Sequence, residues 1–207
     1  MQVLFVHGMG RSPLSGSVLL WKLRRAGLTT HTFGYSVSFE DFQRIRDRLV
    51  AAISRLAAHG DYVLIGHSLG GVLLRAAINA LPAGTRLPNH LFLLGSPVSS
   101  SRLAQRFGMH PLFRLITRDC GRLLASTNRM AEIGAVAVPT ICIAGISGLR
   151  GSRSYFPGES NDGIVSLSEV AADWAIEHVQ VPVFHTLMPS SHLVAELVLE
   201  RILKTRM

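Results

Sequence analysis

Residues 66–71 read Gly-His-Ser-Leu-Gly-Gly and decide the fold of this chain. They follow an apolar run at 62–65, typical of a buried strand, and open an apolar segment at 69–81, typical of a helix that stops before Pro82. A strand, a Gly-x-Ser-x-Gly turn and a helix in this order are the setting of a nucleophile elbow, in which the serine takes a strained backbone conformation. We therefore predict that Ser68 is a nucleophile. The alternative is a glycine-rich structural turn.

Short apolar runs alternate with helix-length periodic segments along the rest of the chain, as in a parallel sheet wrapped by helices. Strands are expected at residues 3–6, 29–35, 62–65, 90–94, 140–144 and 178–184. Helices are expected at 18–28, at 39–56 with Ser38 as the cap and Phe39 on the buried face, at 69–81, and from Ser190 or Ser191 onward. The pattern predicts an α/β fold of about six mostly parallel strands, flanked by helices on both faces, in a single domain spanning residues 1–207.

Residues 96–131 interrupt this alternation and are rich in serine and arginine. We expect one or two helices here that form a small cap or lid over a site. Five apolar residues of this segment are candidates for a pocket that holds an acyl group, and a plain core position is the equal alternative for each: Phe107, Met109, Leu112, Phe113 and Ile116.

The composition excludes several classes of protein. With 207 residues, 48% of them apolar, the chain is neither disordered nor a disulfide-rich mini-domain. Cys120 and Cys142 make neither a disulfide framework nor a zinc site. The longest charge-free apolar stretch, 133–149, is interrupted by Pro139 and three glycines, so it does not predict a membrane span. No metal-ligand spacing and no phosphate-binding glycine loop occurs, so we expect no metal and no cofactor. No secretory signal is visible, and we expect a cytoplasmic location.

Charge is unevenly distributed. Residues 1–131 carry 16 basic and 5 acidic side chains, whereas residues 132–207 carry 5 and 8, and 19 of the 21 basic residues are arginine. No nucleic-acid-binding motif accompanies this charge, and we expect no nucleic-acid partner. A solvated basic face is the plain interpretation, and weak contact with an anionic membrane surface is the alternative.

A second glycine-containing turn stands at residues 7–10, His-Gly-Met-Gly, after the first expected strand. Acyl transfer needs two backbone N–H groups directed at the oxyanion of the tetrahedral intermediate. We expect them from Leu69, at the positive end of the helix after the elbow, and from Met9 in this turn. His7 and His67 flank the expected site, where packing or hydrogen bonding suffices to explain them.

Together these motifs resemble the α/β-hydrolase superfamily, and most closely its small bacterial lipases and esterases, which lack the first strands. The resemblance covers nearly the whole chain, with residues 96–131 not clearly matched. It implies a Ser-Asp-His triad in that chain order, with the acid after the penultimate strand and the histidine after the last.

The resemblance selects Asp162 as the acid, because it follows the strand at 140–144 and precedes a small residue and a valine. A simple Asp-Gly turn is the alternative. For the base, His185 directly follows the last expected strand and matches the family pattern. His192, at the expected start of the last helix, is the other candidate.

These residues imply a serine hydrolase that acts on small-molecule or lipid esters through an acyl-enzyme. The preference for esters comes from the resemblance. Thioester hydrolysis, amide hydrolysis and acyl transfer to an alcohol use the same triad. A protein that binds lipid or another partner on a hydrolase scaffold is the non-enzymatic alternative.

Overall fold

The computed structural model describes residues 1–151 and 154–204. Its centre is a six-stranded sheet in the order β2-β1-β3-β4-β5-β6, in which every neighbouring pair of strands is parallel. The strands are β1 (Gln2–Val6), β2 (Thr29–Phe33), β3 (Tyr62–His67), β4 (His90–Leu94), β5 (Thr140–Gly145) and β6 (Glu177–Val181). The expected α/β architecture is therefore confirmed.

Alternate residues of the central strands enter two separate cores. Leu4 and Val6 of β1 belong to one core, while Val3 and Phe5 belong to the other. This is the period of two that a pleated strand imposes, and both faces are apolar because helices cover both. Every residue of β3 is buried, so the strand that leads to Ser68 is held firmly on both sides.

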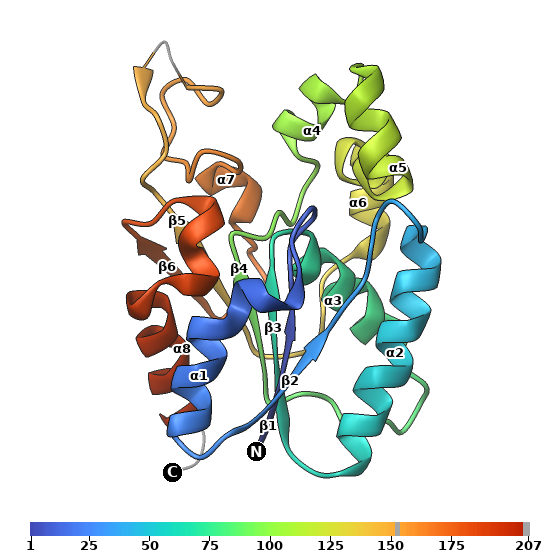
Figure 1. Ribbon diagram of the computed structural model, residues 1–207, viewed down its shortest axis with the longest axis vertical. Helices are drawn as coiled ribbons and strands as arrows, with labels where there is room; N and C mark the ends of the chain where they lie inside the picture. Colours follow the sequence, from blue (N-terminus) through green and yellow to red (C-terminus); the bar gives the residue numbers. More distant parts are fainter. Residues whose placement is uncertain (152–153, 205–207) are drawn as a thin grey trace.

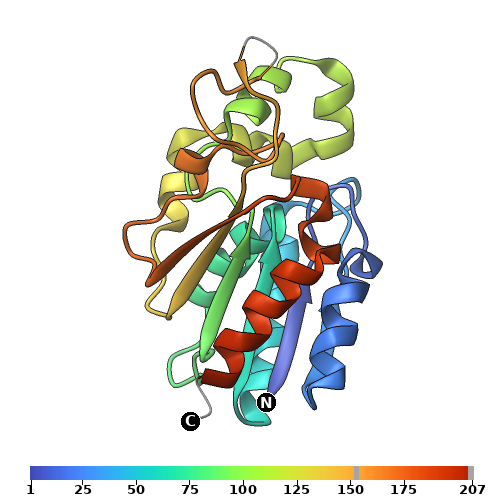
Figure 2. The same ribbon diagram turned by 90° about the vertical axis from the view of Figure 1, so that its left-hand side faces the viewer.

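Helices lie on both faces of the sheet (Figures 1 and 2). One face packs on α1 (Ser17–Arg25) and α8 (His192–Lys204), and the other on α2 (Phe42–Ala58) and α3 (Leu69–Asn79). Short helices fill three of the connections: η1 (Pro13–Gly16), α7 (Leu167–Val170) and η3 (His185–Ser190).

Several boundaries differ from the sequence expectation: β2 ends at Phe33 and not at residue 35, and α1 ends at Arg25 and not at residue 28. Two further differences have a clear cause. Helix α2 begins at Phe42, and its cap is Asp41, whose side chain accepts from the backbone N–H of Arg44 at 2.7 Å. Ser38 instead donates to the carbonyl of Ile116 at 3.0 Å, and Phe39 is 83% exposed. The second difference is that β6 ends at Val181, because Pro182 has no backbone N–H to continue the ladder.

Residues 96–131 contain more helix than expected, and the third helix that begins in this segment ends just beyond it, at Ile133. Three helices form here: α4 (Arg102–Phe107), α5 (Pro111–Ala125) and α6 (Thr127–Ile133). Ser101 and Ser126 cap α4 and α6 through their hydroxyl groups, which is why serine-rich chain folds into short helices. Helix α5 is broken at Arg118, where φ is 46°. Helices α4 and α5 lie beyond the carboxyl ends of the strands (Figure 1).

Candidate active site

Ser68 lies on a strained turn between β3 and α3. Its backbone angles are φ 53° and ψ −124°, a region that non-glycine residues adopt at a cost of about 1–3 kcal/mol. Two hydrogen bonds hold the turn: Ser68 N–H donates to the carbonyl of Leu94 at 2.9 Å, and Ser96 Oγ donates to the carbonyl of Ser68 at 2.7 Å. A Cβ on Gly70 would lie 2.2 Å from the carbonyl oxygen of Val6, so only glycine permits this close approach.

His185 and Asp162 form a buried pair. His185 Nδ1 lies 2.7 Å from Asp162 Oδ2, and the two side chains are 7% and 1% exposed. Because a carboxylate only accepts hydrogen bonds, Nδ1 carries the proton, and in the neutral ring Nε2 is left as a proton acceptor. The backbone N–H of His185 also donates to the backbone carbonyl of Asp162 at 3.0 Å. One hydrogen bond between the side chains and one between the backbones therefore fix the two residues relative to each other.

The Asp162 carboxylate is held in place by its own loop. Its other oxygen, Oδ1, accepts from the backbone N–H groups of Ile164 and Val165 at 2.9 and 2.7 Å. Both oxygens of the carboxylate therefore accept hydrogen bonds, Oδ1 from the loop and Oδ2 from His185. Such a carboxylate can orient a histidine without moving.

The pair lies beside the serine turn, against the chain that leaves β4. Leu94 accepts the hydrogen bond from Ser68, and Gly95 follows it with φ 51°. A Cβ on Gly95 would lie 2.9 Å from Asp162 Oδ2 and 3.0 Å from His185 Nδ1. The carboxyl ends of four parallel strands, β3 to β6, therefore bring the three predicted triad residues to one edge of the sheet.

His192 lies elsewhere. It is exposed at the first position of α8 and lines an open surface hollow with Trp21 and Arg24 of α1. Of the two histidines that the sequence offered, His185 is the one that contacts Asp162.

His67 makes a contact that the sequence did not reveal. Its Nε2 lies 3.0 Å from the backbone carbonyl of His185, and the two rings are 4.8 Å apart. A carbonyl only accepts, so Nε2 carries the proton and Nδ1 is unprotonated. Burial, and next the nearby His185, hold the pKa of His67 well below its ordinary value. Within residues 1–151 and 154–204, Nδ1 has no hydrogen-bond partner.

The turn at residues 8–11 is suited to present an amide. Arg11 N–H donates to the carbonyl of Gly8 at 3.2 Å, and Gly10 at the third position has φ 68°, as a type II turn requires. The N–H of Met9, at the second position, takes no part in the hydrogen bond of the turn. Leu69 is the first residue of α3, and the first four N–H groups of a helix lack partners inside the helix.

His7, the residue directly before this turn, is held in place by Tyr35. Its ring stacks on Tyr35 with centroids 4.3 Å apart, and Tyr35 Oη donates to the carbonyl of His7 at 2.8 Å. Burial lowers the pKa of His7 and raises that of Tyr35 well above its ordinary value, so both groups are neutral around pH 7.

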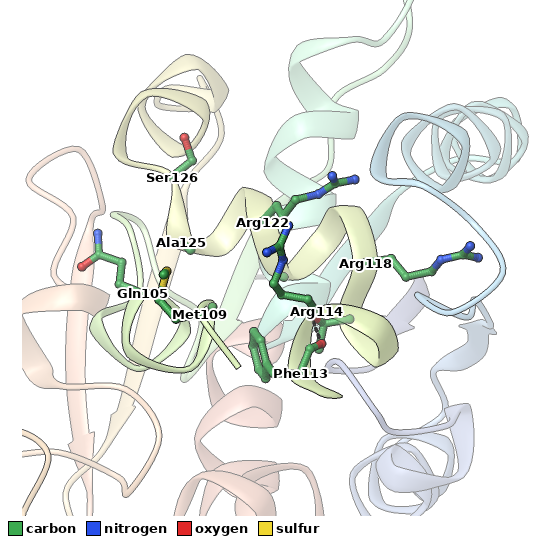
Figure 3. Close-up of a pocket in the computed structure, with 11 residues that line it drawn as sticks. Gln105, Met109, Phe113, Arg114, Arg118, Arg122, Ala125 and Ser126 are labelled. Carbon is green, nitrogen blue, oxygen red and sulfur yellow. Dashed lines mark hydrogen bonds between the residues drawn. The ribbon is translucent and has the colours of Figure 1, made fainter. Parts of the chain in front are cut away.

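The five candidate acyl-pocket residues are not gathered in one place. Met109 and Phe113 line a pocket of about 310 Å³ between α4 and α5, drawn in Figure 3. Phe107, Leu112 and Ile116 do not line it, and they are 37%, 57% and 50% exposed. Ser68, Asp162 and His185 do not line this pocket either.

The remaining chemically reactive groups have structural surroundings. Cys120 and Cys142 are buried, and burial raises the pKa of each thiol to about 12. Among the described residues, no group of three or more His, Cys, Asp or Glu side chains is arranged to hold a metal ion. In the same part of the chain, no helix is long and apolar enough to cross a bilayer.

The parallel sheet, the strained serine turn after β3 and the loops at the same sheet edge define the α/β-hydrolase fold, as the resemblance implied. The mature form of the Bacillus licheniformis lipase BlEst2 matches with a TM-score of 0.76 and 16% identity, over 97% of this chain and 91% of that one. A Paleococcus ferrophilus monoacylglycerol lipase matches with a TM-score of 0.65 and 14% identity, over 99% and 94%.

A third solved structure is the RedJ thioesterase of the prodiginine pathway in Streptomyces coelicolor. It matches with a TM-score of 0.62 and 13% identity, over 99% of this chain and 90% of that one. No protein-family model matches the sequence, and no curated protein matches it. At 13–16% identity these likenesses establish the fold alone.

Proposed function

We propose that this chain is a serine hydrolase that cleaves carboxylic esters, with Ser68 as nucleophile, His185 as base and Asp162 as the orienting acid. The observation that carries the proposal is the buried 2.7 Å contact between His185 Nδ1 and Asp162 Oδ2, beside a serine with φ 53°. A strained serine and a buried, oriented histidine cost stability, and such costs are concentrated at functional sites.

The chemistry follows from this arrangement. Nε2 of His185 takes the proton of Ser68 as the hydroxyl oxygen attacks the ester carbonyl, and Asp162 stabilises the imidazolium that forms. The amide N–H groups of Met9 and Leu69 bind the oxyanion. His185 then protonates the departing alcohol. Water attacks the acyl-enzyme with His185 again as base, which releases the carboxylic acid and restores Ser68.

A thioester is the second candidate substrate, supported by the match to a thioesterase over 99% of the chain. The same triad cleaves both bonds, so the leaving group and acyl pocket decide between them. Hydrolysis of acyl-coenzyme A and p-nitrophenyl esters with the same acyl chains, from C2 to C16, separates the two. A higher kcat/KM for the oxygen esters favours the esterase, and the reverse favours the thioesterase.

Covalent labelling tests the triad before any substrate is known. A fluorophosphonate probe is expected to label wild type at Ser68, and labelling is expected to vanish in Ser68→Ala but persist in Ser17→Ala, an exposed serine on α1. Asp162→Asn is expected to lower ester turnover by roughly 10³–10⁴-fold, since the amide no longer holds the required tautomer. Asp173→Asn, at an exposed aspartate, is the matched control. Turnover that survives in Ser68→Ala contradicts the proposal.

A further inference from the structure

The first half of α5 turns an apolar face toward solvent. Leu112, Leu115 and Ile116 are spaced i, i+3 and i+4, so they share one side of the helix, and they are 57%, 71% and 50% exposed. Met109, just before the helix, is 85% exposed. A surface helix normally buries such a stripe. These four side chains, called the α5 surface below, have no covering element among the described residues.

A neighbouring loop extends this surface. Ser38 Oγ donates to the carbonyl of Ile116 at 3.0 Å, and Arg118 donates to the carbonyl of Ser38 at 2.6 Å. These bonds tie the loop before α2 to α5, and Phe39, next in the chain, is 83% exposed. Exposed apolar groups collected in this way mark an interaction site more often than chance exposure does.

Helix α5 is positively charged, because it carries Arg114, Arg118 and Arg122 and a single acidic residue, Asp119. Asp119 is itself engaged, by Arg129 at 2.9 Å and by the backbone N–H of Phe42 at 3.1 Å, and its contact with Arg122 is longer, at 4.0 Å. Among the ion pairs of the described residues none involves Arg114, which lines a hollow together with the exposed Leu115.

Three arginines surround one shallow hollow on this side of the protein. The hollow has a volume of about 400 Å³ and is lined by Pro111, Arg114, Leu115, Arg118 and Arg122. Figure 3 shows Arg114 and Arg122 projecting from α5 close to each other, while Arg118 points toward the loop that carries Ser38. No acidic side chain lines this hollow. It therefore favours an anionic group above an apolar floor.

We propose that the α5 surface docks on an anionic phospholipid bilayer. Met109, Leu112, Leu115 and Ile116 enter the boundary between head groups and acyl chains, and Arg114 and Arg122 bind lipid phosphates. Protruding apolar side chains bordered by guanidinium groups are what binding at a membrane surface requires, whereas a purely apolar protein partner needs no cations. The proposal rests on this surface alone and does not depend on the triad.

Vesicle co-sedimentation of the full chain tests the proposal. Ser68→Ala is used throughout, so that lipid hydrolysis cannot change the vesicles. Binding is expected to phosphatidylcholine vesicles with roughly 30 mol % phosphatidylglycerol and not to phosphatidylcholine alone, and it is expected to weaken with salt. Arg114→Gln with Arg122→Gln is expected to lower the partition coefficient ~30-fold, about fivefold for each charge. Leu115→Ser is expected to lower it about tenfold.

Matched controls separate this surface from general positive charge. Arg25→Gln with Arg55→Gln removes two exposed arginines from the ends of α1 and α2, and Ile176→Ser removes a side chain that is 64% exposed on another part of the protein. Both controls are expected to bind as the parent does. Equal loss in the controls, equal binding to neutral vesicles, or no binding to anionic vesicles each overturns the proposal. Failure of Ser68 to react with a phosphonate would leave the vesicle result unchanged.

Discussion

His67 donates its Nε2–H to the backbone carbonyl of His185 across 3.0 Å, although 118 positions separate the two residues in the chain. The residue before the predicted nucleophile therefore holds the main chain of the predicted base. His185 is thus fixed through its side chain by Asp162 and through its carbonyl by His67. This makes His67 a positioning residue, which acts on the reaction through His185.

Removing this donor is expected to lower kcat more than it raises KM. We expect His67→Leu to reduce kcat about tenfold, the worth of one buried hydrogen bond, with KM nearly unchanged, since His67 is 1% exposed. His67→Gln keeps an N–H donor near the position of Nε2 and is expected to restore most of the loss. Steady-state kinetics on a soluble short-chain ester measures both values.

A merely structural role for His67 gives a different result. The two variants would then differ in the free energy of unfolding but share one kcat per folded molecule.

The burial of His67 also predicts a pH-dependent stability. Its pKa in the folded chain is lowered, first by burial and then by His185, so the unfolded chain binds a proton that the folded chain excludes. Stability from this residue is therefore fully present above the unfolded pKa, about 6.5, and falls as the pH drops below it. The slope reaches about 1.4 kcal/mol per pH unit.

Urea denaturation at pH 7.5, 6.5 and 5.5 measures this slope. His7 and His90 have lowered pKa values too, so the wild-type slope alone does not isolate His67. The difference between wild type and His67→Gln does. We expect the variant to lose less stability between pH 6.5 and 5.5. Parallel curves would show that His67 does not titrate with unfolding.

Gly95 is expected to be more sensitive to substitution than other glycines with positive φ. Alanine at this position meets two penalties: a φ of 51°, and a Cβ within 3.0 Å of both Asp162 Oδ2 and His185 Nδ1. Gly27→Ala is the matched control, since its φ is 80° but no atom lies within 4 Å of the new Cβ. Both variants are expected to lose about 1–2 kcal/mol of stability from backbone strain.

Activity separates the two variants. Gly95→Ala is expected to lower kcat by at least tenfold because it pushes apart the predicted acid and base, whereas Gly27→Ala keeps the kcat of wild type. Thermal unfolding and ester turnover on the same samples check both statements. Equal activity in the two variants would mean that the acid and base shift without consequence.

The sequence predicted those parts of the protein that depend on local rules. Strand β3, the turn at Ser68 and helix α3 were readable from apolar periodicity and glycine positions, and the choice of Asp162 and His185 came from a family resemblance. The contacts between loops at the carboxyl ends of the strands could not be predicted from the sequence. Nothing near Gly95 in the chain indicates that it packs against Asp162 and His185, because the strand order creates that contact.

The segment at 96–131 shows the same limit. Its serines predict helix caps. The break in α5 was not predictable, because at this break the Arg118 side chain donates to the carbonyl of Ser38, which lies in a loop 80 residues earlier in the chain. Apolar periodicity in α5 was also ambiguous. The apolar residues of this helix were equally consistent with a core and with an acyl pocket, and the structure shows that Leu112 and Ile116 face solvent.

The role of Met9 as an oxyanion donor is testable by removing its N–H alone. Met9 is the second residue of a turn whose third residue, Gly10, has φ 68°, and proline is common at the second position of such type II turns. Met9→Pro therefore preserves the turn while deleting the donor. We expect kcat on a soluble ester to fall by roughly 10²–10³-fold, as for loss of one oxyanion donor elsewhere.

Met9→Ala is the necessary partner of this variant, since it removes the side chain and keeps the N–H. It is expected to retain kcat within a few-fold. Both variants are expected to react with a fluorophosphonate at Ser68, more slowly in Met9→Pro, because the phosphoryl oxygen uses the same donors. If Met9→Ala and Met9→Pro lose the same activity, the side chain matters and the amide does not, and the second oxyanion donor must lie elsewhere in the turn.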